Sequence, residues 1–99
     1  MATFPSGGLT LAYDDIGGRG EGRPMILVHG FATNRAENWR RLGWYGALER
    51  RRTRAVALDL RGHGESAKPH DPSAYGRENM AGDILALMDH LDIARAHVL

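Results

Sequence analysis

Hydrophobic and polar residues follow two different periods along the chain. Residues 9–14 alternate between apolar and polar or small side chains, which predicts a strand with one buried face. Residues 25–29, MILVH, form a continuous apolar run, which is typical of a central strand covered on both faces. Residues 54–59, RAVALD, and residues 96–99 form similar runs, so we expect two more buried strands.

A helical period appears in two other segments. Residues 77–91 predict an amphipathic helix with Gly76 as its N-cap. Its apolar positions recur at i, i+4, i+7, i+8 and i+11 and are Met80, Ile84, Leu87, Met88 and Leu91. Residues 36–51 have helix-like spacing but contain Gly43 and Gly46, which favours two short helices there.

The remaining segments are connections. Residues 17–24, GGRGEGRP, predict a tight hairpin-type return between the first two strands, and residues 60–76 predict a loop rich in glycine and proline. The alternation of strands with helices predicts an α/β fold, in which an antiparallel start is followed by parallel strands with crossover helices. Without repeats or linkers, residues 1–99 are expected to form one incomplete domain.

Composition narrows the classes of function. The chain has 99 residues, of which 42% are hydrophobic and 25% charged, and this excludes a disordered protein. A formal charge of +1 implies no polyelectrolyte partner, and Arg50, Arg51 and Arg52 are expected to face water at a helix end rather than bind nucleic acid. The longest apolar run, residues 25–28, is too short to span a bilayer. We therefore expect a soluble, cytoplasmic protein with neither a membrane nor a nucleic-acid partner.

The lack of cysteine and the spacing of the histidines exclude further kinds of site. Without cysteine the chain has no disulfide, thiolate nucleophile or sulfur-ligated zinc. The histidines lack the spacing of a metal site, so no metal or cofactor is expected. Trp39 and Trp44 are predicted to belong to the core rather than to form a platform for substrate.

Two loops follow apolar strands at the carboxyl end of the predicted sheet, where α/β folds place their ligands. In the first loop, VHGFATN, Gly30 is expected to take a positive φ and leave the amides of Phe31 and Ala32 pointing outward. Such amides would stabilise an anion, although an ordinary strand-to-helix turn has the same pattern. In the second loop, DLRGHGES, Asp59 is either a catalytic acid or, more commonly at such a site, an acceptor for amides of its own loop.

Several motifs taken together resemble a known family. The segments HGFA, then Trp39, then ALDLRGHGES and MAGDILALMDHLDIARAHVL are similar to the N-terminal half of the α/β-hydrolase superfamily, from about Leu9 to Leu99. The resemblance is strongest to its esterase, epoxide-hydrolase, haloperoxidase and carbon–carbon hydrolase groups. It implies a hydrolase that acts on a small-molecule ester or related bond without a cofactor.

The resemblance also implies roles for individual residues. The backbone N–H of Phe31 matches an oxyanion-hole donor, with Ala32 as a possible second, and His29 matches a structural histidine that supports this loop beside Gly30. A structural loop at the edge of the sheet is matched by Asp59, Arg61, Gly62, His63, Gly64 and Ser66.

The family places its nucleophile in a G-x-S-x-G turn directly after the strand that begins here at HVL. Leu99 is the last residue, and none of Ser6, Ser66 and Ser73 lies between glycines at this spacing. We therefore expect a chain truncated just before its nucleophile, lacking also the acid and the catalytic histidine, and inactive alone. An apolar edge strand would make such a fragment poorly soluble.

Two other classes of protein share parts of this pattern. A dinucleotide-binding domain needs three glycines in G-x-G-x-x-G, whereas GFATNR has one. A non-catalytic binding module on the same fold stays open, because fold does not fix function.

Overall fold

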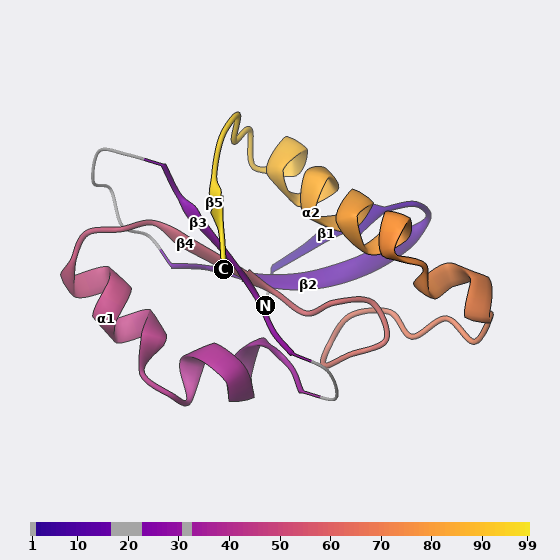
Figure 1. Cartoon of the computed structure of the whole chain (residues 1–99), viewed down its shortest axis with the longest axis horizontal. Coiled ribbons are helices and arrows are strands. Elements are labelled where there is room, and N and C mark those ends of the chain that lie inside the picture. Colours follow the sequence, from indigo (N-terminus) through magenta and orange to yellow (C-terminus); the bar gives the residue numbers. More distant parts are fainter. Residues whose placement is uncertain (1, 17–22, 31–32) are drawn as a thin grey trace.

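The protein forms a three-layer α/β structure, described here by a computed structural model that covers residues 2–16, 23–30 and 33–99 (Figure 1). The elements are β1 (Ala2–Ser6), β2 (Leu9–Ile16), β3 (Met25–Val28), the π-helix η1 (Ala36–Arg40), α1 (Trp44–Arg50), β4 (Ala55–Leu58), the 3₁₀ helix η2 (Pro72–Tyr75), α2 (Arg77–His90) and β5 (His97–Val98). In Figure 1, α2 covers one face of the sheet, and η1 and α1 cover the other.

The five strands form one mixed sheet in the order β1-β2-β4-β3-β5. The pairs β1–β2 and β2–β4 are antiparallel, whereas β3 is parallel to both β4 and β5. This confirms the predicted antiparallel start followed by parallel strands. The parallel pairs are joined by helices, as crossover connections require.

The predicted hairpin-type return after β2 is wrong. Strand β2 pairs with β4, which lies between β2 and β3, so the chain must pass beyond β4 to begin β3. Most of that connection, residues 17–22, lies outside the described residues. The pattern of glycines indicated a turn but carried no information about which strand would become the neighbour of β2.

Strand β1 was not predicted from the sequence. It forms a hairpin with β2 through Gly7 and Gly8, whose φ angles of 53° and 83° match the turn type that suits two-residue hairpins. Pro5 is tolerated in this strand because β1 lies at the edge of the sheet and needs no donor on its outer side.

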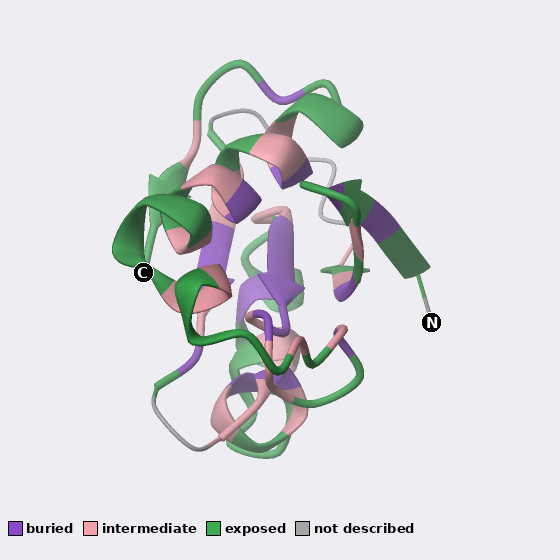
Figure 2. Cartoon of the chain, turned by 90° about the vertical axis from the view of Figure 1, so that its right-hand side faces the viewer, coloured by how far each residue is buried: buried purple, intermediate pink, exposed green. Residues whose placement is uncertain are grey.

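Two apolar clusters lie on opposite faces of the sheet. One contains Val56 and Leu58 of β4 with Leu87 of α2, and the other contains Ala55 and Ala57 of β4 with helical side chains of the opposite layer. Figure 2 shows the buried residues concentrated on the central strands, with exposed residues on the outer sides of the helices. Residues 55–58 are all buried, as expected for a strand covered on both faces.

The helices follow the prediction except for η2, a short 3₁₀ helix inside residues 60–76, which were predicted to be a loop. Gly76 is the N-cap of α2, and Gly43, with φ 84°, separates η1 from α1, while Gly46 lies inside α1. Trp39 is buried as expected, but Trp44 is 40% exposed, so its assignment to the core is wrong. Trp44 begins α1 directly after the Gly43 turn and contacts the Trp39 ring in a T-shaped arrangement, with 5.5 Å between the ring centroids.

Strand β5 lies at the open edge of the sheet, with Val98 57% and Leu99 48% exposed. Within the described residues, no helix has the length and apolar character needed to cross a membrane.

Candidate functional site

Three parallel strands bring their carboxyl ends to one edge of the sheet. Residues 29–35 follow β3, and residues 59–68 follow β4, so both loops begin at this edge. The N–H of Val28 donates to the carbonyl oxygen of Leu99, with 2.9 Å between N and O. The end of β5 therefore lies beside the start of the β3 loop, at the position where open α/β folds bind their ligands.

The β3 loop starts at Gly30 without the predicted backbone strain. The φ angle of Gly30 lies outside the left-handed region, and among the described residues an added Cβ would make ordinary contacts with Asn38 and Thr33. The prediction of a positive φ is therefore wrong. Without a positive φ, the N–H of Gly30 still turns toward Asn38 Oδ1 and donates to it over 3.0 Å. Phe31 and Ala32, the predicted oxyanion-hole residues, lie outside the described residues.

His29 links the two loops through both ring nitrogens. Its Nδ1 lies 2.8 Å from the carbonyl oxygen of Gly30, and its Nε2 accepts the N–H of Leu60 at 2.9 Å. This pattern requires a neutral ring with its proton on Nδ1. Burial lowers the pKa of His29, which favours the same neutral form. His63 packs on this ring at a centroid distance of 4.9 Å, and its own Nδ1 lies 3.1 Å from the carbonyl oxygen of Arg61.

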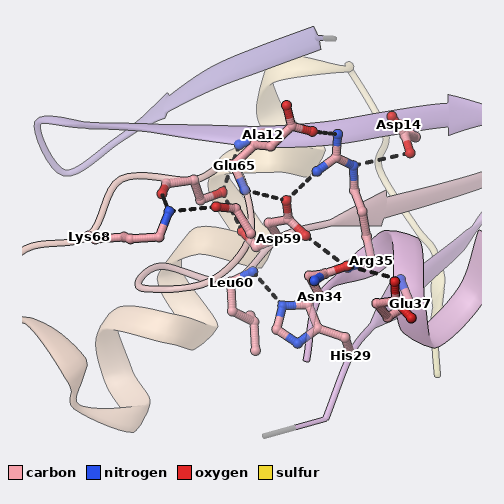
Figure 3. Close-up of polar contacts among 12 residues, drawn as sticks. Ala12, Asp14, His29, Asn34, Arg35, Glu37, Asp59, Leu60, Glu65 and Lys68 are labelled. Carbon is pink, nitrogen blue, oxygen red and sulfur yellow. Dashed lines mark hydrogen bonds and ion pairs between the residues drawn. The ribbon is translucent and has the colours of Figure 1, made fainter. Parts of the chain in front are cut away.

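Asp59 follows β4 and has both carboxylate oxygens occupied. The side chain is 1% exposed, and Oδ1 accepts the backbone N–H of Arg35 at 2.8 Å. Oδ2 accepts the N–H of Glu65 at 2.8 Å and also pairs with the Arg35 guanidinium (Figure 3). Asp59 thus accepts a backbone N–H of its own loop, which is the second of the two roles that the sequence suggested for it. A carboxylate whose two oxygens are both occupied in this way is not free to exchange a proton with a substrate.

Arg35 is the central residue that the sequence did not reveal. It is 5% exposed, and its guanidinium contacts Asp59, Asp14 of β2 at 3.1 Å and Glu65 at 2.8 Å. Its Nε–H is paired with Asp14 by charge alone and has no hydrogen-bond acceptor among the described residues. Tyr45 donates its hydroxyl to the same Asp14 carboxylate at 2.8 Å, and burial together with this bond raises the pKa of Tyr45. No spacing rule indicates that Arg35 turns inward.

Arg61 forms a second buried ion pair on the other side of the β4 loop. Its Nε and Nη2 donate to the two carboxylate oxygens of Asp83 at 2.8 and 2.6 Å, and Nη1 donates to the carbonyl oxygen of Ala74. Asp83 is fully buried and also accepts the hydroxyl of Ser6 at 2.6 Å. The sequence did contain a signal for this pair, since Asp83 shares the apolar face of α2 with Leu87, four residues later.

Two glycines shape the β4 loop by their lack of a side chain. Gly62 and Gly64 have φ angles of 81° and 50°, in the left-handed region. A Cβ on Gly62 would lie 2.6 Å from the ring of Tyr75, and a Cβ on Gly64 would collide with the carboxylate of Asp59. The loop therefore passes close to both side chains because it has glycine at these positions.

Ser66 is occupied by backbone groups. Its hydroxyl donates to the carbonyl oxygen of Asp59 at 2.6 Å and accepts the N–H of Ala12 at 2.8 Å. The residue is 2% exposed, so this hydroxyl is not available to attack a substrate. Over the described residues, the structure also brings together no group of three or more side chains able to hold a metal ion.

Comparisons with known proteins agree with this architecture. The family described as alpha/beta hydrolase fold matches residues 23–99. The chain is 46% identical over 92 residues to the dihydrolipoyllysine-residue acetyltransferase component of the acetoin cleaving system of Pseudomonas putida, covering 93% of this chain and 23% of that protein. A crystal structure of an epoxide hydrolase from Vigna radiata superimposes with a TM-score of 0.82 at 33% identity, covering 98% of this chain and 30% of that one. The enol-lactonase from Burkholderia xenovorans LB400 superimposes with a TM-score of 0.80 at 33% identity, covering 98% of this chain and 35% of that one.

The chain thus spans well under half the length of these relatives, while almost all of its own length is matched. The matched region contains β3, β4, β5 and both loops of the site, the elements on which the resemblance was based. The chain belongs to the alpha/beta hydrolase fold family.

Proposed function

We propose that these residues supply the oxyanion side of an active site that cleaves an ester or related bond through a covalent intermediate. The observation that carries the proposal is the pairing of Leu99 with Val28, which places the end of β5 beside the loop that starts at Gly30. A nucleophile that follows β5 would emerge next to that loop. The backbone N–H of Phe31, with Ala32 as a possible second, would then stabilise the negative charge that develops on the substrate oxygen.

His29 and Asp59 would act by position rather than by proton transfer. Both nitrogens of His29 and both carboxylate oxygens of Asp59 are engaged, which leaves neither side chain free as a base. One oxyanion-hole donor is worth roughly 3 to 4 kcal/mol, and only when a nucleophile is present. The nucleophile, the acid and the catalytic histidine would come from outside these 99 residues, so we expect the isolated chain to be inactive.

The relatives support an acyl or related bond as the target. An enol-lactonase, by its name, acts on a lactone, which is a cyclic ester, and an epoxide hydrolase opens a strained carbon–oxygen bond. Both types of reaction place negative charge on an oxygen, for which fixed amides are suited. The proposed substrate is therefore a small molecule that carries an ester, lactone or related group.

The test uses the polypeptide encoded by the complete reading frame, with the isolated 99-residue chain as the matched control. We expect the complete polypeptide to hydrolyse p-nitrophenyl acetate with a burst of nitrophenolate, and a covalent adduct to appear in its mass spectrum. The 99-residue chain should show neither. A complete polypeptide that is folded but gives no turnover and no adduct with esters, lactones or epoxides would refute this function and favour a non-catalytic binding module.

A second candidate function is acyl transfer. It is favoured by the 46% identity to the acetyltransferase component from Pseudomonas putida, which exceeds the 33% identity to either hydrolase structure. The two reactions share an acyl-enzyme intermediate and differ in whether water or another nucleophile removes the acyl group. Adding dihydrolipoamide to the p-nitrophenyl acetate assay separates them, because a transferase forms acetyl-dihydrolipoamide in preference to acetate.

A further inference from the structure

The β3 loop is fixed to the rest of the sheet at two points. At its start, His29 bonds to the carbonyl oxygen of Gly30 and to the N–H of Leu60, and the Gly30 N–H donates to Asn38. At its end, the backbone N–H of Arg35 donates to Asp59 Oδ1. Both attachments are made by described residues at the two ends of the loop.

Arg35 makes the second attachment with both its backbone and its side chain. The same carboxylate, Asp59, accepts the Arg35 N–H on one oxygen and pairs with the guanidinium on the other, so position and orientation are both set (Figure 3). The guanidinium also contacts Asp14 of β2 and Glu65 of the β4 loop. The β3 loop, strand β2 and the β4 loop are distant in sequence, and all three meet at the Arg35 guanidinium.

Stability alone is a poor reason for this arrangement. Buried ion pairs cost desolvation, and replacing them with apolar residues is often neutral or stabilising. Here one guanidinium that is 6% exposed faces three carboxylates, of which Asp59 is 1% exposed. The ion pairs of Arg35 are better explained by the geometry that they fix. Catalytic groups must be held to within a fraction of an ångström by neighbours that are themselves fixed.

We propose that Arg35 is a positioning residue, which sets the geometry of the β3 loop for the proposed oxyanion hole by tying the loop to Asp59, Asp14 and Glu65. This inference rests on the proposed function, because that loop carries the proposed donors. Arg35 itself touches no substrate in this proposal, and its effect passes through the backbone of the loop.

The first measurement compares Arg35→Met with Arg54→Met in the complete polypeptide. Arg54 is a matched control because it also pairs with a β2 carboxylate, Asp15, through two hydrogen bonds of 3.2 and 2.8 Å, but at the opposite end of the β2–β4 pair. With p-nitrophenyl acetate, we expect Arg35→Met to lower kcat about 10- to 100-fold with KM within about 3-fold of wild type. Arg54→Met should leave both constants within about 2-fold of wild type.

Active-site titration from the burst corrects kcat for any misfolded fraction. Arg35→Lys, which keeps the charge but loses the planar fork, should recover part of the lost kcat. The inference is overturned if folded Arg35→Met keeps its kcat, or if Arg54→Met loses as much.

The second measurement is independent of activity and separates the two proposals. Hydrogen exchange should become at least about 10-fold faster at the amides of Gly30, Arg35 and Glu65 in Arg35→Met, relative to strand amides of β4 in the same sample. If Arg35→Met does not fold, the same comparison is made with Arg35→Lys. If exchange at these amides is unchanged in Arg35→Met, the positioning role is overturned even where no ester is turned over. If exchange is faster in Arg35→Met but the wild type is inactive, only the proposed function is refuted.

Discussion

Replacing Gly64 with alanine tests how closely the β4 loop approaches the buried Asp59 carboxylate. The added Cβ would collide with this carboxylate, which is 1% exposed and cannot rotate toward solvent. The carboxylate must therefore move and weaken its bonds to the Glu65 N–H and to Arg35. We expect Gly64→Ala to destabilise the protein far more than its small size suggests.

The cost can be worked out from two contributions. Gly64 has a φ of 50°, and placing alanine in the left-handed region costs roughly 1 to 2 kcal/mol. Disturbing a hydrogen bond to a charged group costs about 1.5 to 3 kcal/mol, and at least one of the Asp59 bonds must be disturbed. The expected loss in the free energy of unfolding is therefore about 2.5 to 5 kcal/mol.

Gly8→Ala is the matched control, because Gly8 has a φ of 83° but no atom of the described residues lies within 4 Å of an added Cβ. It should lose only the conformational cost, about 1 to 2 kcal/mol. Urea unfolding of the complete polypeptide, followed by circular dichroism, measures both variants. Repeating Gly64→Ala in an Asp59→Ala background should reduce its cost to that of Gly8→Ala, since the collision partner is gone. Equal losses for Gly64→Ala and Gly8→Ala in the natural background would refute the argument.

Two further predictions concern the buried polar residues around the site. Asp83→Ala should lower the free energy of unfolding in urea by about 3 to 5 kcal/mol, because it leaves the Arg61 guanidinium buried without its carboxylate. The double change Asp83→Leu with Arg61→Met should recover much of this loss. A double variant no more stable than Asp83→Ala would contradict this explanation. The lowered pKa of His29 means that the unfolded chain binds a proton near the ordinary value of 6.5 while the folded chain does not, so the free energy of unfolding should fall as the pH drops below about 6.5. His29→Asn should reduce this slope when unfolding is compared at pH values between about 7.5 and 5.5, and an identical slope in both proteins would show that His29 is not the group responsible.

Much of the fold was predictable because it depends on local patterns. The continuous apolar runs predicted β3 and β4 as strands covered on both faces, and the period of residues 77–91 predicted α2 with its Gly76 cap. These features follow from side-chain spacing, which neighbouring residues determine. β1 was missed because its Pro5 is acceptable only at a sheet edge, and being at an edge is a property of the whole sheet.

In the candidate site, too, some residues were predictable from the sequence and others were not. Gly30 and the loop from Asp59 to Ser66 were found from the sequence, because glycines and polar residues after apolar strands mark the carboxyl edge of a sheet. The inward turn of Arg35 was not found, since an arginine near a helix start usually faces water. Only Asp59 and Asp14, distant in sequence, make its burial favourable.

The sequence by itself determined the strands from β2 to β5, the main helices, the α/β class and the two loops that meet at the carboxyl edge, but not β1 or η2. Only the tertiary structure decided that β4 lies between β2 and β3, that Gly30 needs no left-handed backbone, and that Arg35 joins three carboxylates. The physical reason is one of range. Periodicity and turn chemistry act over a few residues, whereas the neighbours of a strand and the partners of a buried charge are chosen by segments that meet only after the sheet has assembled.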